Sequence, residues 1–205
     1  MFGQGDSVRV TTNISRPRGR PRRFDPEQAV AIAQRLFHTQ GYDAVSVADI
    51  TEALGINPPS FYAAFGSKAA LYARTLCRYT GTEGIPLAEI LRPGRPLAEA
   101  LSAVLESCAR RYGADPAAAG CLVIEGARCK DPEARNAARA LSTTAADTIR
   151  QFIAATHPEA AERLTDYVVT LMVGLSTMAR EGHGADRLLA TARLASLALE
   201  QELGA

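Results

Sequence analysis

The densest group of charged side chains in the sequence is a run of arginines near the N-terminus. Residues 16–23 read RPRGRPRR, and the two prolines and the glycine in this run disfavour a helix. An extended, arginine-rich arm of this kind can bind phosphates and the minor groove of DNA. The alternative is a solvated charge run without a partner, but the arm directly precedes the first clear helical pattern of the chain. We therefore expect DNA contacts from its five arginines, Arg16, Arg18, Arg20, Arg22 and Arg23.

The cysteines and histidines are the other groups with potential chemistry, and their spacing forms no recognisable site. The cysteines at positions 77, 108, 121 and 129 contain no C-x-x-C pair, and the histidines at 38, 157 and 183 are scattered. This spacing argues against a structural zinc site. The sequence also has no nucleophile–base motif and no glycine-rich phosphate loop. We therefore expect no metal, no cofactor and no enzymatic activity.

Cys121 is the most reactive candidate among the thiols. It follows Gly120 at a predicted helix start, where free backbone amides can stabilise a thiolate. Cys121 and Cys129 on one continuous helix would lie about 12 Å apart, too far for an undistorted disulfide. Sensing of oxidants or electrophiles by a thiol stays open as an alternative, beside the simpler interpretation of the cysteines as small buried hydrophobic residues.

The stretch 45–68, VSVADITEALGINPPSFYAAFGSK, predicts two short helices joined by a tight turn. Ser46 and Asp49 form a start that resembles a capping box, and Gly55 supplies the left-handed residue that ends the first helix. Asn57 is a good N-cap for the second helix, and Pro58 occupies a position where a missing N–H costs nothing. The outer face of this second helix is small and nearly uncharged, which suits insertion into a DNA major groove.

These motifs resemble the tetracycline-repressor-like (TetR) family of transcriptional regulators. The resemblance covers residues 24–76, FDPEQAVAIAQRLFHTQGYDAVSVADITEALGINPPSFYAAFGSKAALYARTL. It includes an amphipathic helix, a Gly-Tyr turn, a capped helix, a Gly-Ile-Asn turn and a Ser-Lys pair that opens a fourth helix. The resemblance implies a homodimer that binds a near-palindromic operator, since two recognition helices then lie one or more turns of DNA apart.

The resemblance also implies roles for individual residues of the helix-turn-helix. Tyr62 and Lys68 are expected to contact phosphates, and Ser46 contributes at the start of its helix. For Tyr62 the alternative is a half-buried aromatic with a packing role. The positions from which relatives read bases are small or apolar in this sequence, so contacts to thymine methyls and DNA shape should carry the specificity. These positions are Ala48, Pro58, Pro59 and Ser60.

The last two helical patterns are more apolar than a single buried face requires. Stripes wider than one face imply two neighbours, and we expect one of them to be a second subunit. A four-helix bundle made from two copies of this helix pair is the dimer interface of the TetR family. The alternative is that the stripes only close the core of the monomer. The residues we expect in the interface are Leu164, Val168, Leu171, Leu175, Leu188, Leu194 and Leu197.

The resemblance further implies a pocket in the helical body, where a ligand that prefers the DNA-incompetent state would bind. A mostly apolar pocket suggests a hydrophobic or aromatic effector. For each candidate residue the alternative is ordinary core packing. The candidates are Cys77, Cys108, Tyr112, Cys121, Phe152, Met172 and Met178.

Charge and composition fit this interpretation. The net charge of +1 hides an asymmetry, because residues 1–80 carry +4 and residues 81–205 carry −3, and the basic part is the helix-turn-helix part. Neutral overall charge argues against nonspecific DNA packaging. No stretch approaches roughly 18 uninterrupted apolar residues and no signal peptide is evident, so we expect a cytoplasmic protein without a membrane partner.

Together these patterns predict an all-α protein of about nine helices. We expect a disordered tail and basic arm over residues 1–23 and a three-helix DNA-binding domain over 24–68. A helical domain for effector binding and dimerisation should occupy 69–205. The function expected is a repressor that binds double-stranded operator DNA and is released by a small, hydrophobic effector. A thiol-based sensor and, with less support, a helical small-molecule-binding protein or enzyme are the alternatives.

Overall fold

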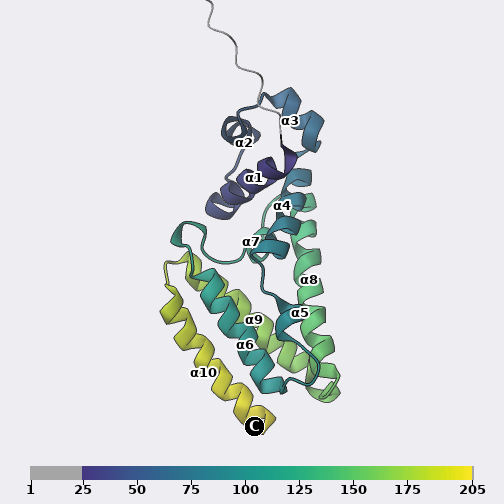
Figure 1. Cartoon of the computed structure of the whole chain (residues 1–205), viewed down its shortest axis with the longest axis vertical. Coiled ribbons are helices and arrows are strands. Elements are labelled where there is room, and N and C mark those ends of the chain that lie inside the picture. Colours follow the sequence, from purple (N-terminus) through teal and green to yellow (C-terminus); the bar gives the residue numbers. More distant parts are fainter. Residues whose placement is uncertain (1–24, 205) are drawn as a thin grey trace, which may run out of the picture.

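The computed structural model describes residues 25–204, and within that range every regular element is helical. The expectation of an all-α protein is therefore confirmed. The arginines of the arm, residues 16–23, lie outside the described residues. Figure 1 shows an elongated molecule in which the first three helices occupy one end and the C-terminal helix reaches the other.

The end that carries the helix-turn-helix, here called the head, consists of α1 (Pro26–Gln40), α2 (Val47–Leu54) and α3 (Pro58–Phe65). Each of these helices starts at a side-chain cap: Asp25, Ser46 and Asn57 all accept hydrogen bonds from amides of the first turn, and Ser46 and Asn57 are the caps predicted from the sequence. Gly55 ends α2 with φ of 64°, in the left-handed region that glycine adopts without steric cost. Local sequence chemistry therefore sets the boundaries of the head helices.

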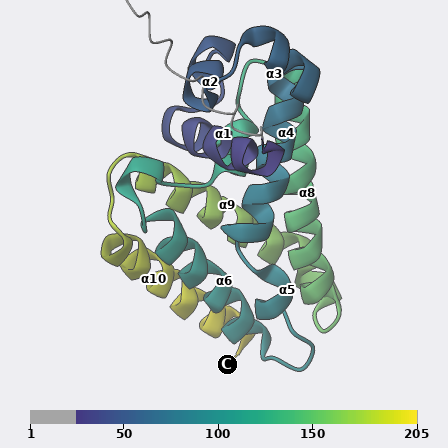
Figure 2. The ribbon, with the colours of Figure 1, turned by 45° about the horizontal axis from the view of Figure 1, so that its top comes forward.

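The helix α4 (Lys68–Thr82) starts at the Ser67 cap and links the head to the helical body. In Figures 1 and 2 it runs beside α1 and then enters the body next to the long helix α8. The helices of the body follow in chain order, with two short 3-10 turns between them: α5 (Leu87–Ile90), α6 (Leu97–Tyr112), η1 (Pro116–Ala118), α7 (Leu122–Gly126), α8 (Pro132–Ala154), η2 (Pro158–Ala160), α9 (Ala161–Arg180) and α10 (Ala185–Leu203).

One hydrophobic core runs from the head into the body without interruption. Its aromatic centre joins α1 to α4: the rings of Phe37 and Tyr72 meet edge to face with centroids 4.9 Å apart, and Tyr42 lies 4.8 Å from Tyr72. All three side chains are buried. Such packing resists small displacements, so a shift of α4 should carry α1 with it.

Every helix between residues 25 and 204 is too short or too polar to cross a lipid bilayer.

Candidate nucleic-acid interface and ligand cavity

The outer surface of α2 and α3 carries the residues that sequence analysis assigned to DNA. Four of these residues are exposed, and the base-reading role implied for them stays a prediction. They are Ala48, Pro58, Pro59 and Ser60. Tyr62 is 53% exposed and packs its ring edge to face against Phe61, whose side chain is fully buried. Phe61 therefore anchors α3 in the head and holds the phenol of Tyr62 on the outside, where a phosphate could reach its hydroxyl.

Ser46 and Asp49 close a full capping box at the start of α2. The Ser46 hydroxyl accepts from the Asp49 amide at 3.1 Å, and the Ser46 amide donates to the Asp49 carboxylate at 2.7 Å. The Ser46 hydroxyl also donates to the Asp49 carboxylate at 2.7 Å, and this bond together with that from the Ser46 amide lowers the pKa of the Asp49 carboxyl group. Ser46 thus fixes the start of α2, while the phosphate contact implied for it stays a prediction.

Lys68 differs from the simple expectation of a free ammonium group. Its Nζ donates to the carbonyl of Tyr42 at 3.0 Å and to that of Val45 at 2.8 Å, and lies 4.0 Å from the centroid of the Tyr42 ring. Lys68 therefore ties the turn between α1 and α2 to the start of α4. An ammonium group has three donors, so one N–H remains for the phosphate contact that the resemblance implies.

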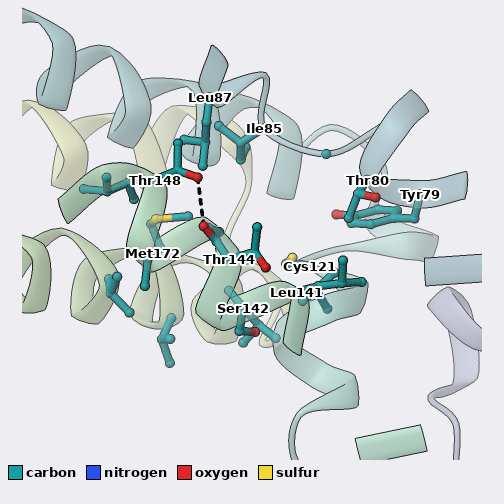
Figure 3. Close-up of a pocket in the computed structure, with 18 of the residues that line it drawn as sticks. Tyr79, Thr80, Ile85, Leu87, Cys121, Leu141, Ser142, Thr144, Thr148 and Met172 are labelled. Carbon is teal, nitrogen blue, oxygen red and sulfur yellow. Dashed lines mark hydrogen bonds between the residues drawn. The ribbon is translucent and has the colours of Figure 1, made fainter. Parts of the chain in front are cut away.

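A cavity of about 350 Å³ lies in the body between α4 and the later helices. Its walls come from α4, the loop to α5, α6, the segment around α7, and the middle parts of α8 and α9, as Figure 3 shows for the labelled residues. Aliphatic, alanine and hydroxyl side chains make up most of the lining. The cavity has the size and apolar character of a small-molecule site.

The structure brings three of the seven predicted pocket residues to this cavity, namely Tyr112, Cys121 and Met172. The other four lie elsewhere. Cys77 is exposed on α4, where it lines a separate surface groove with Glu27 and Arg74, while the other three pack within the helical body without reaching the cavity. These three are Cys108, Phe152 and Met178.

Sequence reasoning missed the hydroxyl-bearing side of the cavity. Ser142, Thr144 and Thr148 lie along α8 and line it, together with Thr80 of α4. A cluster of hydroxyl residues in the middle of a long helix is unusual, because serine and threonine are poorer helix formers than alanine or leucine. That local departure from helix propensity was a signal in the sequence for a functional surface on α8.

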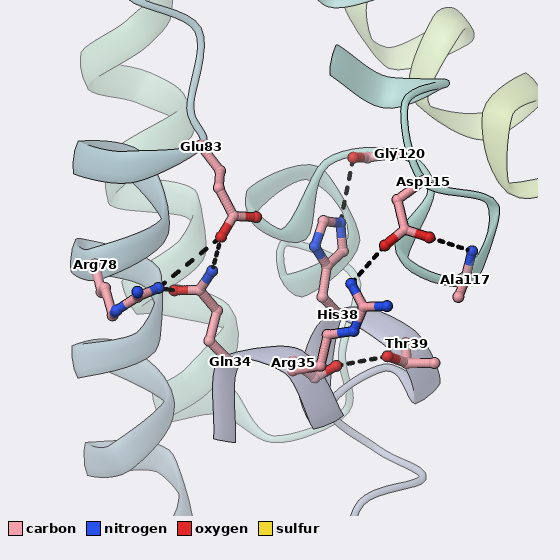
Figure 4. Close-up of polar contacts among 9 residues, drawn as sticks. All are labelled: Gln34, Arg35, His38, Thr39, Arg78, Glu83, Asp115, Ala117 and Gly120. Carbon is pink, nitrogen blue, oxygen red and sulfur yellow. Dashed lines mark hydrogen bonds and ion pairs between the residues drawn. The ribbon is translucent and has the colours of Figure 1, made fainter. Parts of the chain in front are cut away.

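A set of contacts between α1 and the segment that starts at Gly120, here called the joint, connects the head to the body close to this cavity. The Nε2–H of His38 donates to the carbonyl of Gly120 at 3.3 Å, and the His38 ring meets that of Tyr79 edge to face. Tyr79 and Cys121, the neighbour of Gly120, both line the cavity. Figure 4 shows His38 with the ion pair of Arg35 and Asp115 beside it. His38 therefore contacts the cavity wall directly from the head.

The segment from Gly120 to Asp131, which contains α7, makes further contacts with the head. The hydroxyl of Tyr42 donates to the Asp131 carboxylate at 2.7 Å, and the Lys130 amide donates to the Asp43 carboxylate at 3.1 Å. Gly126 faces the hydroxyl of Tyr72 so closely that a Cβ at this position would lie 2.3 Å from that oxygen. Only glycine lets this segment pack against α4, so the joint is closely fitted.

Burial lowers the pKa of His38 below its ordinary value of 6.5, which makes the joint sensitive to acid. Between pH 6.5 and the lowered pKa, the unfolded chain binds a proton at this histidine and the native state does not. Stability should therefore fall as the pH drops below about 6.5, by at most about 1.4 kcal/mol per pH unit. Urea unfolding of the wild type and of His38→Gln between pH 7.5 and 5 would measure the difference in slope. Equal slopes for the two proteins would contradict this prediction.

Four of the predicted interface leucines and valines are buried inside the monomer, and the prediction was wrong for them. Leu164, Val168, Leu175 and Leu188 are at most 3% exposed, because they face α6 and the neighbouring helices of the same chain. Leu171 is half-buried. Leu194 and Leu197 on α10 are 69% and 60% exposed, which is unusual for leucine and leaves an apolar surface uncovered.

Within residues 25–204 no group of three or more His, Cys, Asp or Glu side chains is placed to hold a metal ion.

Comparison with known proteins agrees with the fold. Residues 30–75 match the family model described as bacterial regulatory proteins, tetR family. The chain is 53% identical over 191 residues to the HTH-type transcriptional repressor BdcR of Escherichia coli (strain K12), covering 93% of this chain and 97% of BdcR. It is 28% identical to the HTH-type transcriptional repressor ComR of the same strain, covering 87% of this chain and 90% of ComR.

A solved structure gives the same result in three dimensions. A cysteine mutant of the TetR family transcriptional regulator CifR, complexed with a 26-base-pair double-strand operator DNA, superposes with a TM-score of 0.78. The two chains are 32% identical, and the match covers 87% of this chain and 99% of CifR. The chain therefore belongs to the tetR family of bacterial regulatory proteins and is a DNA-binding transcriptional repressor of the helix-turn-helix type, not an enzyme.

Proposed function

We propose that the protein acts in the cytoplasm as a homodimeric repressor that leaves a near-palindromic operator when a small, hydrophobic effector fills the body cavity. The observation that carries this proposal is the shared boundary of cavity and head. Tyr79 and Cys121 line the cavity, and His38 of α1 contacts Tyr79 and the Gly120 carbonyl. A change in cavity shape thus acts directly on α1 of the head, against which α2 packs.

Release requires an effector that binds the DNA-incompetent arrangement more tightly than the competent one. The cavity walls on α4 and around α7 are also the parts of the body that hold the head. Because the packed core is not continuously deformable, widening the cavity should displace α4 and the Gly120–Asp131 segment as units. Their displacement would change the distance between the two heads of a dimer.

The outward α2–α3 surface supports DNA recognition with few polar base contacts. Of Ala48, Pro58, Pro59 and Ser60, only Ser60 can hydrogen-bond a base edge with its side chain. Apolar contact in the major groove is made with the C5-methyl group of thymine. We therefore assign sequence selectivity to thymine methyls and DNA shape, and affinity to phosphate contacts from Tyr62, Lys68 and the basic arm.

Replacing thymine by uracil in the operator tests this assignment. Uracil lacks the C5-methyl group and keeps the same hydrogen-bonding edge, so only the apolar contact is lost. We expect each contacted thymine to cost about 1 kcal/mol when replaced, or roughly 5-fold in affinity. Fluorescence anisotropy with single-site replacements would locate the contacts. Unchanged affinity at every position in the half-site would contradict readout through methyl groups.

The uncovered leucines on α10 support a dimer through α9 and α10. The surface in question, here called the α9–α10 face, comprises Leu194 and Leu197 on α10 and the half-buried Leu171 and Met178 on α9. Gly174 of α9 is exposed with open space at its Cβ position, so a second helix could approach closely there. A pair of these faces would form the four-helix interface.

An anisotropy titration of the whole chain against the intergenic DNA beside its own gene tests the proposed function. We expect tight binding that weakens steeply between 50 and 200 mM salt, with two protomers per site. Random DNA of the same length and composition is the control. Equal binding to both DNAs would reject operator recognition at that site.

Thiol sensing stays a second candidate because Cys121 lines the cavity. Burial raises the pKa of Cys108 to about 12 and also raises that of Cys129, so those two thiols stay protonated and inert. In a Cys77→Ser background, N-ethylmaleimide would release DNA from the protein with Cys121 intact but not from Cys121→Ser. Equal release from both proteins would exclude Cys121 as the sensor.

A further inference from the structure

The cavity excludes charged ligands by its chemistry. None of its lining residues is Asp, Glu, Lys, Arg or His, and its aliphatic part includes Ile85, Leu87, Leu141 and Ile149. A carboxylate or ammonium group placed there would lose its hydration without gaining a counter-ion, which carries a large free-energy penalty. The ligand that fits this cavity is therefore uncharged.

The volume of the cavity limits the size of that ligand. An engineered apolar protein cavity of about 150 Å³ is large enough for benzene. The present cavity measures about 350 Å³, a little more than twice that volume. A molecule of two fused or linked rings, or an aliphatic chain of equal volume, would fill it.

The hydroxyl groups on the cavity wall add a preference for hydrogen-bond donors. The Thr148 hydroxyl donates to the carbonyl of Thr144 at 2.8 Å, and the Thr144 hydroxyl donates to the carbonyl of Ala140 at 3.0 Å. Figure 3 shows these two threonines one turn apart on α8. Since a hydroxyl has one proton, each can offer only its lone pairs to a ligand.

The other hydroxyl residues of the wall do not reverse this preference. The phenol O–H groups of Tyr79 and Tyr112, which also line the cavity, donate to the sulfur atoms of Cys121 and Cys108. The Thr80 hydroxyl also donates within its own helix, to the carbonyl of Cys77 at 2.9 Å. Ser142 makes no hydrogen bond to the described residues, so it can serve a donor or an acceptor equally well. The acceptor character of the wall therefore comes from Thr144 and Thr148, which face a ligand from the same side.

We propose that the effector is an uncharged, largely apolar molecule of about two rings that carries a hydroxyl or N–H group, and that this group donates to Thr144 and Thr148. Phenols, alcohols and neutral aromatic amines of this size belong to the class. Ethers and ketones of the same shape have acceptors only and are disfavoured, and carboxylates are excluded. The inference rests on the proposed function in treating this cavity as the effector site.

A matched set of naphthalene derivatives tests the class on the whole purified chain by isothermal titration calorimetry at pH 7. Naphthol has a donor, methoxynaphthalene has only an acceptor, and naphthoate is charged. We expect naphthol to bind roughly 3- to 10-fold more tightly than methoxynaphthalene, as one neutral hydrogen bond allows. Naphthoate should bind at least about 100-fold more weakly than naphthol, because its charge would give up water contacts and no cationic side chain lines the cavity to pair with it.

Threonine-to-valine variants assign the preference to the two residues. Valine matches threonine in shape and lacks the hydroxyl, so Thr144→Val with Thr148→Val should bring naphthol and methoxynaphthalene within about 2-fold of each other. Unchanged methoxynaphthalene affinity shows that the cavity of the variant is intact. Thr143→Val is the matched control, because Thr143 is exposed on the same helix outside the cavity, and it should keep the full preference.

Two results would overturn the proposal: methoxynaphthalene or naphthoate binding as tightly as naphthol, or none of the three compounds binding at all. DNA binding of the same samples without any compound separates this inference from the proposed function. Intact operator binding with no donor preference rejects the ligand class alone. If the wild-type protein without any compound does not bind operator DNA specifically, the proposed function is rejected.

Discussion

The double substitution Leu194→Glu and Leu197→Glu is expected to convert the protein to a monomer and to abolish operator binding at submicromolar concentration. Each leucine is more than half exposed in the single chain, and its burial in a dimer would contribute about 1.5–3 kcal/mol. The glutamates remove that contribution and also place four carboxylates in an apolar interface. The dissociation constant of the dimer should rise by at least roughly 1,000-fold.

Operator affinity should fall with it, since a monomer presents one recognition helix instead of two. Analytical ultracentrifugation and anisotropy on the same samples would measure both effects. Ala88→Glu is a suitable control, because Ala88 is exposed on α5, away from the α9–α10 face. A double variant that stays dimeric would place the interface elsewhere on the molecule.

Replacing the five arginines of the basic arm by alanine should be the most damaging change to DNA affinity outside the helix-turn-helix. Each phosphate contact contributes about 0.9 to the slope of log affinity against log salt concentration. If all five arginines contact phosphates, the slope should become shallower by about 4.5, and affinity near physiological salt should fall by roughly 100-fold or more. Anisotropy titrations at four or more salt concentrations would give the slope.

A control with the same change in net charge separates contact from long-range attraction. It replaces five exposed body arginines by alanine and should leave the salt slope nearly unchanged. An equal loss of slope in both variants would mean that overall charge, and not the arm, attracts the DNA. The control residues are Arg92, Arg110, Arg111, Arg128 and Arg139.

The sequence was sufficient to predict the head almost to the residue. Ser46, Asn57 and Ser67 cap the three helices at which they were expected or implied, since capping depends on hydrogen bonds within four residues. The same holds for Gly55, which ends α2. Such local interactions are readable without knowledge of the tertiary structure.

The errors concern choices that only tertiary structure makes. The apolar stripe on α9 is wide enough to face two neighbours, and periodicity does not show which side meets α6 of the same chain and which side stays open. Leu164 and Val168 were therefore assigned to an interface although they face the monomer core. The roles of Lys68 and His38 depend on carbonyls of distant segments, which no local pattern reveals.

The uneven exposure of the cysteines allows a fluorescent dye to be attached to the protein at a single site. Cys77 is exposed on α4 beside α1, while Cys108, Cys121 and Cys129 are buried. A maleimide dye, which is much larger than N-ethylmaleimide, should therefore attach only at Cys77 of the unmodified chain, in a groove bounded by Arg74, Arg78 and Glu27. That groove lies between α4, which lines the cavity, and α1 of the head. The quantum yield of the dye should therefore change when these two helices move relative to each other. Compound libraries could then be screened for effectors by fluorescence alone, before any operator is known.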